Sequence, residues 1–227
     1  MPPPNRPPAN TPTPRTPPAE PALAVETERL RTQLRLQRPS EFALLAGGVY
    51  APHPQATDTG KLSLKLWGET IDLDFPELVA RREALGPLPL PFQALLMFYL
   101  ATTDGLASAG EWVSFSDLPG GRMYAQAFQG YSGHVLTRTF GEDVAAFQSA
   151  CLKVGGVPVE LGDAAFAFAG LPRVPLMVTY WQGEDEIPST AQVLFDRSAT
   201  HHLPVDVCAI MGSMLVSRIL KANPTQA

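Results

Sequence analysis

The segment Asp196–Pro204, DRSATHHLP, holds two of the four histidines of the chain side by side. His201 and His202 are residue types that bind metal ions or act as a general base, and Asp196 and Asp206 could complete a metal site. Adjacent side chains on an extended segment point to opposite sides, which argues against both histidines binding one ion. These four residues therefore define an alternative hypothesis, a metal-dependent enzyme. The competing interpretation is a strand-to-helix loop in which one histidine is packed.

A glycine turn is the leading candidate for a ligand-binding site. Gly120 and Gly121 permit positive φ and a close approach of the backbone to another surface. Arg122 and Tyr124 follow with a guanidinium and a hydroxyl group. The backbone N–H groups of such a turn can surround an anion, although the turn lacks the residues of a P-loop. A plain turn without a ligand is the alternative.

An acidic turn is the second candidate for binding. Glu184, Asp185 and Glu186 are consecutive carboxylates, and Trp181 precedes them as an aromatic surface for stacking. Carboxylates bind hard cations such as calcium, but this spacing is not that of an EF-hand loop. A solvated hairpin turn is the alternative.

Composition and charge argue against several classes of partner and cofactor. The formal net charge is −5, so we expect no nucleic-acid partner, and no apolar run approaches the roughly 20 residues of a membrane span. Cys151 and Cys208 are the only cysteines, which is too few for an iron–sulfur cluster. We expect both to be buried thiols in a reducing cytoplasm. The identity of any other cofactor is left open by the sequence. The expected partner is a small molecule or a protein of unknown identity.

Proline, glycine and hydrophobic periodicity predict the elements that position these residues. Ten of the 24 prolines fall in residues 1–21, which we expect to form a disordered tail. We expect this tail to be a solubilising leader, and a ligand for a proline-binding domain is the alternative. Residues 22–227 are predicted to form a single α+β domain of antiparallel hairpins packed with several helices. Hairpins are expected at 61–75 and 174–195, and an extended segment is expected after the Pro-Gly-Gly turn. Helices are expected at the ranges 21–37, 39–46, 76–86, 91–101, 133–140, 142–154 and 204–218. Ser132 is expected to cap one of these helices.

Several blocks of the sequence, in order, resemble the DUF3786 family of bacterial and archaeal proteins. They lie at Ser114–Phe128, Leu171–Pro175, Trp181–Pro188 and Val193–Asp206, and the resemblance spans about residues 42–220. Some similar proteins carry a four-cysteine iron–sulfur module of the kind found in corrinoid and one-carbon proteins, which implies a link to that metabolism. This chain lacks those cysteines, so the resemblance implies no cluster here and no established activity. We therefore expect a non-catalytic, cytoplasmic ligand-binding or accessory module.

Overall fold

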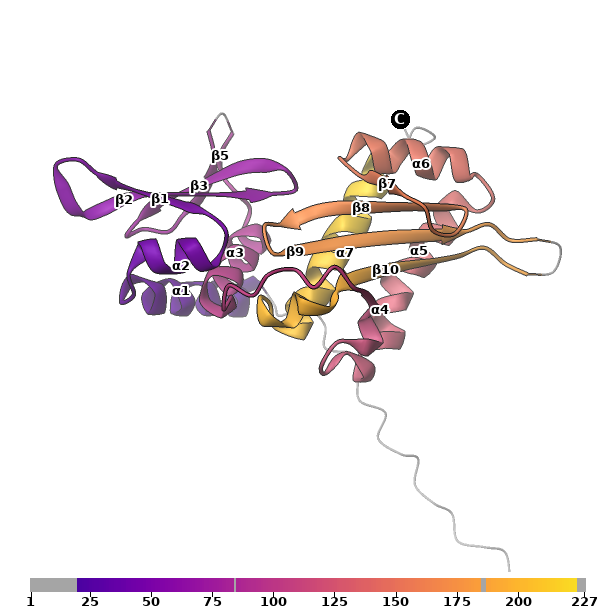
Figure 1. Cartoon of the computed structure of the whole chain (residues 1–227), viewed down its shortest axis with the longest axis horizontal. Helices are drawn as coiled ribbons and strands as arrows, with labels where there is room; N and C mark the ends of the chain where they lie inside the picture. Colours follow the sequence, from indigo (N-terminus) through magenta and orange to yellow (C-terminus); the bar gives the residue numbers. More distant parts are fainter. Residues whose placement is uncertain (1–19, 84, 185–186, 224–227) are drawn as a thin grey trace, which may run out of the picture.

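The computed structural model describes residues 20–83, 85–184 and 187–223 (Figure 1). Residues 1–19 of the predicted tail lie outside these ranges, and the predicted end of the tail at residue 21 is wrong, because Glu20 and Pro21 begin the helix α1 (Glu20–Arg35). The chain forms two five-stranded antiparallel sheets, in the orders β1-β2-β3-β4-β5 and β6-β10-β9-β8-β7. In Figure 1 the first sheet and α1–α3 lie on the left, and the second sheet and α4–α7 lie on the right. This arrangement confirms the predicted α+β class.

The first half of the chain builds the first sheet and its helices. The elements are α1 (Glu20–Arg35), α2 (Pro39–Leu45), β1 (Val49–His53), β2 (Ala56–Leu66), β3 (Glu69–Phe75), β4 (Ala80–Arg82), β5 (Gly86–Pro87) and α3 (Leu90–Thr102). The predicted hairpin is confirmed as β2 and β3, and Leu62, Leu64 and Leu66 are buried as a period of two requires.

The second half builds the second sheet. Its elements are β6 (Trp112–Ser114), η1 (Phe115–Asp117), η2 (Gly121–Met123), α4 (Ala125–Tyr131), α5 (Gly133–Phe140), α6 (Val144–Lys153), β7 (Val157–Val159), β8 (Ala164–Leu171), β9 (Val174–Trp181), β10 (Thr190–Asp196), η3 (Arg197–His201) and α7 (Val205–Lys221). The second predicted hairpin is confirmed, since β9 and β10 pair from Trp181 with Thr190 to Leu176 with Phe195.

The helix predicted at residues 76–86 is wrong, because this segment forms β4 and β5. Ala80 pairs with Leu73 of β3. The side chain of Gln93 on α3 accepts from the Ala80 N–H (2.9 Å) and donates to the Ala80 carbonyl (2.8 Å). Leu78 has a φ of +54°, which a right-handed helix excludes. A residue outside the segment therefore decides its conformation.

The extended segment predicted after the Pro-Gly-Gly turn is also wrong, since η2 and α4 follow the turn. The reason is packing, because Phe128 on α4 stacks on Phe115 with ring centroids 4.5 Å apart and lies 5.8 Å from Phe195. Ser132 precedes α5 as predicted but does not cap it with its side chain. The Ser132 hydroxyl donates instead to the carbonyl of Phe128.

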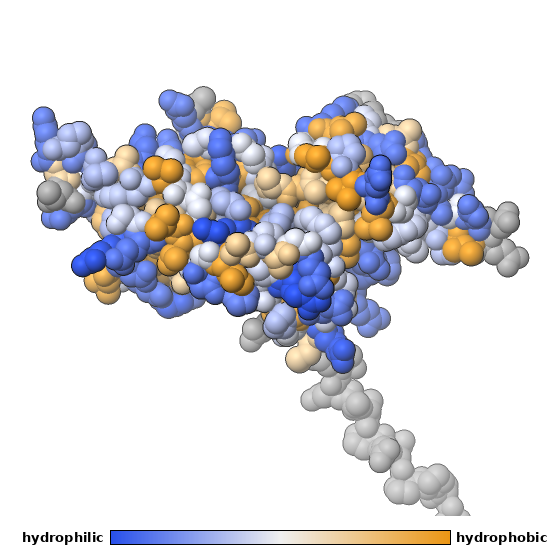
Figure 2. Space-filling model, viewed as in Figure 1, coloured by the Kyte–Doolittle hydropathy of each residue, from blue (hydrophilic) through white to orange (hydrophobic). Residues whose placement is uncertain are grey.

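The buried side chains form one cluster that runs from the first sheet into the second. Both cysteines are buried and free, as predicted, and burial raises the pKa of the Cys208 thiol to about 12, which makes it a poor nucleophile. Figure 2 shows separated orange apolar patches among polar residues on the face in view. None of the helices in the described ranges is long and apolar enough to span a bilayer.

Candidate functional site

Asp196 is buried at the end of β10, where its carboxylate accepts five hydrogen bonds. Oδ2 accepts from the Ser108 hydroxyl (2.6 Å) and the Gly110 N–H (2.8 Å). Oδ1 accepts from the Ala109 N–H (2.9 Å) and from the N–H (2.9 Å) and hydroxyl (2.6 Å) of Ser198. Burial raises the pKa of Asp196, but the hydrogen bonds outweigh burial and hold the pKa well below its usual range.

The residues after Asp196 bind the same loop, residues 103–111. The Arg197 guanidinium forms a bidentate ion pair with the Glu111 carboxylate (2.6 Å for both contacts). The backbone N–H of Arg197 donates to the Glu111 carbonyl (2.9 Å). His201 Nδ1 lies 2.8 Å from Oδ2 of Asp104 on the surface. We call Asp196, Arg197, His201 and His202 the clasp, because each contacts this loop.

His202 is the packed histidine that the loop interpretation expects. Its ring is fully buried, and Nδ1 lies 2.8 Å from the Thr103 hydroxyl. Nε2 is buried without a hydrogen-bond partner. Burial lowers the pKa of His202, so the imidazole is held neutral.

The clasp and Asp206 do not assemble a metal site. Among the described residues, no three His, Cys, Asp or Glu side chains come close enough to hold an ion. Asp206 lies exposed on the first turn of α7, where Oδ1 accepts from the Val207 N–H (3.0 Å). Asp196 and His201 already have protein partners. The metal-dependent alternative therefore gains no support from this region.

The glycine turn lies between η1 and α4. Gly120 has a φ of +80°, the positive value that its sequence permits. Gly121 is buried, and a Cβ added there would lie 1.8 Å from the Phe115 carbonyl oxygen. Arg122 is exposed without a hydrogen-bond or ion-pair partner in the described part of the chain, and Tyr124 is half-buried. Gly121 thus serves packing, while ligand binding at Arg122 and Tyr124 stays a prediction.

The acidic turn is described only in part. Asp185 and Glu186 lie outside the described residues. Glu184 is exposed and forms an isolated β-bridge with Ile187. Trp181 is half-buried at the end of β9. Binding at this turn also stays a prediction.

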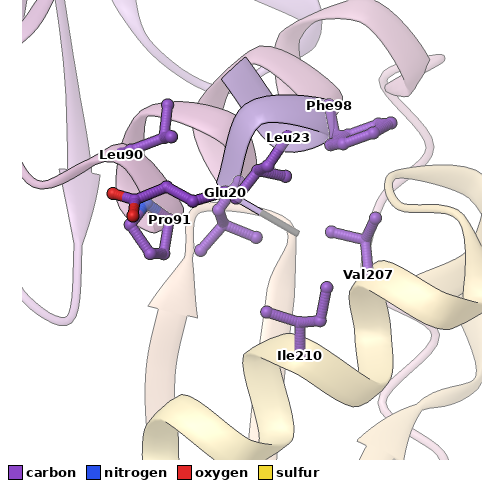
Figure 3. Close-up of a pocket in the computed structure, with 8 residues that line it drawn as sticks. Glu20, Leu23, Leu90, Pro91, Phe98, Val207 and Ile210 are labelled. Atoms are coloured by element: carbon purple, nitrogen blue, oxygen red, sulfur yellow. The ribbon is translucent and has the colours of Figure 1, made fainter. Parts of the chain in front are cut away.

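One hollow, which we call the larger hollow, lies between α1, α3 and α7, and it is lined by residues that the sequence analysis did not single out as a site (Figure 3). Its volume is about 270 Å³. Val207 and Ile210 of α7 face the side chains of α1 and α3 across it, and Glu20 lies beside Pro91 at its edge (Figure 3). The lining residues are Glu20, Leu23, Leu90, Pro91, Leu95, Phe98, Val207 and Ile210.

A smaller hollow of about 190 Å³ lies between η1, α4 and β10. Its rim combines hydroxyl and amide groups with apolar side chains. It is lined by Ser114, Phe115, Ser116, Ala125, Phe128, Gln129, Gln192 and Val193. Since Ala125 directly follows Tyr124, this hollow borders the glycine turn.

A family model, "Domain of unknown function (DUF3786)", matches residues 40–218. The chain belongs to the DUF3786 family. This confirms the resemblance seen in the sequence. No curated protein and no solved structure matches the chain.

The DUF3786 match covers only some of the features described above. The clasp, the glycine turn and the smaller hollow all lie within it. The α3 and α7 walls of the larger hollow also belong to the DUF3786 region. Glu20 and Leu23, which form the α1 wall, precede the matched residues. The larger hollow is therefore built by the DUF3786 region together with a helix outside the match.

Proposed function

We propose that this DUF3786 protein is a non-catalytic binding or accessory module, whose ligand lies in the larger hollow. The observation that supports this proposal is the lining, which is apolar at every position except Glu20. Burying apolar ligand surface gains about 25 cal/mol per Å². The Glu20 carboxylate at the edge favours a cationic or hydrogen-bond-donating group. The proposed ligand is thus a small apolar molecule with an amino group.

The size of the hollow limits the ligand further. At about 270 Å³, it is slightly smaller than the roughly 300–1,000 Å³ of most small-molecule sites. A single ring or a short alkyl chain suits this volume.

Hexylamine and hexanol test the two parts of the proposal on the full chain. We expect saturable binding of both in NMR titrations, with hexylamine the tighter ligand. Ile210→Gln should weaken the binding of both probes by about tenfold, since it removes apolar contact area. Glu20→Gln should weaken the binding of hexylamine alone. Ile187→Gln is the matched control, because Ile187 is 71 % exposed and does not line the hollow. Failure of both probes to saturate, or an equal loss in the control, would contradict the proposal.

The resemblance adds corrinoid or one-carbon metabolism as the proposed context of this module. Native mass spectrometry and an absorption spectrum of the protein purified anaerobically from its own host test that context. A bound organic molecule without a metal would support the module, and its mass would give the ligand class. A stoichiometric metal that disappears in His201→Ala would favour the metal-dependent alternative instead.

A further inference from the structure

Trp67 occupies a backbone conformation that large side chains rarely adopt. It forms the β2–β3 turn with Gly68, and the two φ angles are +53° and +80°. Such turns favour Asn, Asp or Gly, so a bulky residue at positive φ is a genuine outlier. The Trp67 N–H donates to the Gly170 carbonyl of β8 (2.8 Å), which fixes the turn against the second sheet. Outliers of this kind gather at functional sites.

The indole of Trp67 is also an unused hydrogen-bond donor. The residue is only 9 % exposed, and its Nε1 is buried without a hydrogen-bond partner. A buried N–H without an acceptor costs free energy that a bound acceptor would recover. The indole group therefore points to an acceptor supplied from outside the described chain.

Arg218 of α7 lies over this ring. Its Cζ is 5.5 Å from the ring centroid, within the range of a cation–π contact. Its Nε is buried without a hydrogen-bond partner, and no carboxylate in the described ranges lies within ion-pair distance of it. The side chain as a whole is partly exposed, so solvent reaches part of it.

Two further charged groups act on Arg218. Glu69 and Arg82 pair with each other, with Arg82 Nε 2.8 Å from Glu69 Oε2, although this N–H is not aligned for a hydrogen bond. Burial lowers the pKa of Arg218, Glu69 raises it, and Arg82 lowers it again. A guanidinium stays protonated in proteins, so the three side chains together carry one net positive charge.

We infer that Trp67, Arg82 and Arg218 form a binding site for a compact oxyanion, either a carboxylate or a phosphate group. An oxyanion would accept from the indole and guanidinium donors that lack acceptors, and it would balance the excess positive charge. Arginine suits this role because its planar fork matches the oxygens of both groups. The site is separate from the larger hollow, so this inference and the proposed function can fail independently.

Tryptophan fluorescence tests the inference, because the chain has three tryptophans. Replacing Trp112 and Trp181 by Phe leaves Trp67 as the only emitter. Sodium phosphate and sodium acetate are then titrated at constant ionic strength. We expect a saturable change in Trp67 emission with phosphate, and the acetate titration shows whether carboxylates share the site.

Variants of this single-tryptophan protein identify the donors. Arg218→Gln should weaken binding by about tenfold, the effect of losing a hydrogen bond to a charged group. Arg218→Lys keeps the charge and loses the planar fork of the guanidinium, so it should weaken anion binding less. It replaces Arg218→Gln as the test if the Arg218→Gln protein does not fold. Arg138→Gln is the matched control, since Arg138 is exposed on α5 and has no partner in the described part of the chain.

Three results would overturn the inference. One is the absence of a saturable change with either anion. Another is undiminished binding in a folded Arg218→Gln or Arg218→Lys protein. The third concerns calorimetry on the chain that keeps all three tryptophans. If Arg122→Gln abolishes anion binding there and Arg218→Gln does not, the anion binds at the glycine turn.

Discussion

Both carboxylate oxygens of Asp196 are already occupied by donors from the 103–111 loop and from Ser198. A cation could bind this carboxylate only by displacing those donors, each of which would then be left unpaired. Asp196, which the sequence suggested as a metal ligand, thus holds the 103–111 loop in place. Its hydrogen bonds should therefore contribute to the free energy of unfolding.

Replacing Asp196 by Asn tests this role. The new amide group would direct N–H donors at neighbouring donors, so we expect the free energy of unfolding at neutral pH to fall by about 3 kcal/mol. Urea denaturation followed by circular dichroism measures the change. Glu111→Gln is the control, because the Glu111–Arg197 ion pair is exposed to solvent and its loss should lower the unfolding free energy much less than Asp196→Asn does. Equal effects of the two changes would contradict a central role for Asp196.

The pH dependence of stability gives a second test at Asp196. Its pKa in the folded protein is below the usual value, so its stabilisation is complete above about pH 4, the ordinary pKa of Asp. That stabilisation is lost as the pH falls towards the folded-state pKa. The difference in unfolding free energy between the unmodified protein and Asp196→Asn should therefore shrink below about pH 4. Urea titrations across this range check it, and a constant difference would count against the assignment.

At the scale of elements, the glycine turn decides where α4 lies. We expect Gly121→Ala to lower the unfolding free energy by about 2 kcal/mol or more, because the new Cβ would lie 1.8 Å from the Phe115 carbonyl oxygen. Gly130→Ala in α4 meets nothing within 4 Å and should stabilise the protein by up to about 1 kcal/mol. Thermal unfolding of both variants measures the contrast. Similar behaviour of the two would show that the turn tolerates a side chain.

Periodicity predicted the elements whose own side chains determine their packing. Leu62, Leu64 and Leu66 alternate, and the β2–β3 hairpin followed from them. The prediction of a helix at 76–86 was wrong because Gln93, which lies outside this segment, binds the backbone of Ala80. No local pattern contains that contact.

The candidate sites were harder to predict than the fold. The sequence predicted a loop with one packed histidine but did not show which of the two it is. His202 is the packed one, and its contact with Thr103 joins residues far apart in the chain. The sequence did not predict the larger hollow, because Leu95 and Ile210 each fit the apolar stripe of a helix. Such a stripe predicts that a face is covered and says nothing about whether the covering leaves space.

At the scale of the whole molecule, side chains and backbone groups join the two sheets. The Tyr99 hydroxyl on α3 donates to the Ala46 carbonyl (2.8 Å) and accepts from the Arg173 N–H between β8 and β9 (3.2 Å). The Trp67 N–H reaches Gly170 in the same β8–β9 region. Since the buried cluster is continuous across this junction, opening it would expose apolar surface on both sides.

We therefore predict that residues 22–227 unfold as one unit. Variants that keep only Trp67 or only Trp181 report on the first and second sheets, and their urea transitions should share one midpoint. Leu215→Ala removes a fully buried side chain of α7 and should lower the unfolding free energy by about 3 kcal/mol in both variants. Ser217→Ala, at an exposed position of the same helix, should leave both transitions nearly unchanged. Two separate midpoints, or a shift by Leu215→Ala in one variant alone, would show that the sheets belong to independent domains, because a shared core cannot lose stability on one side only.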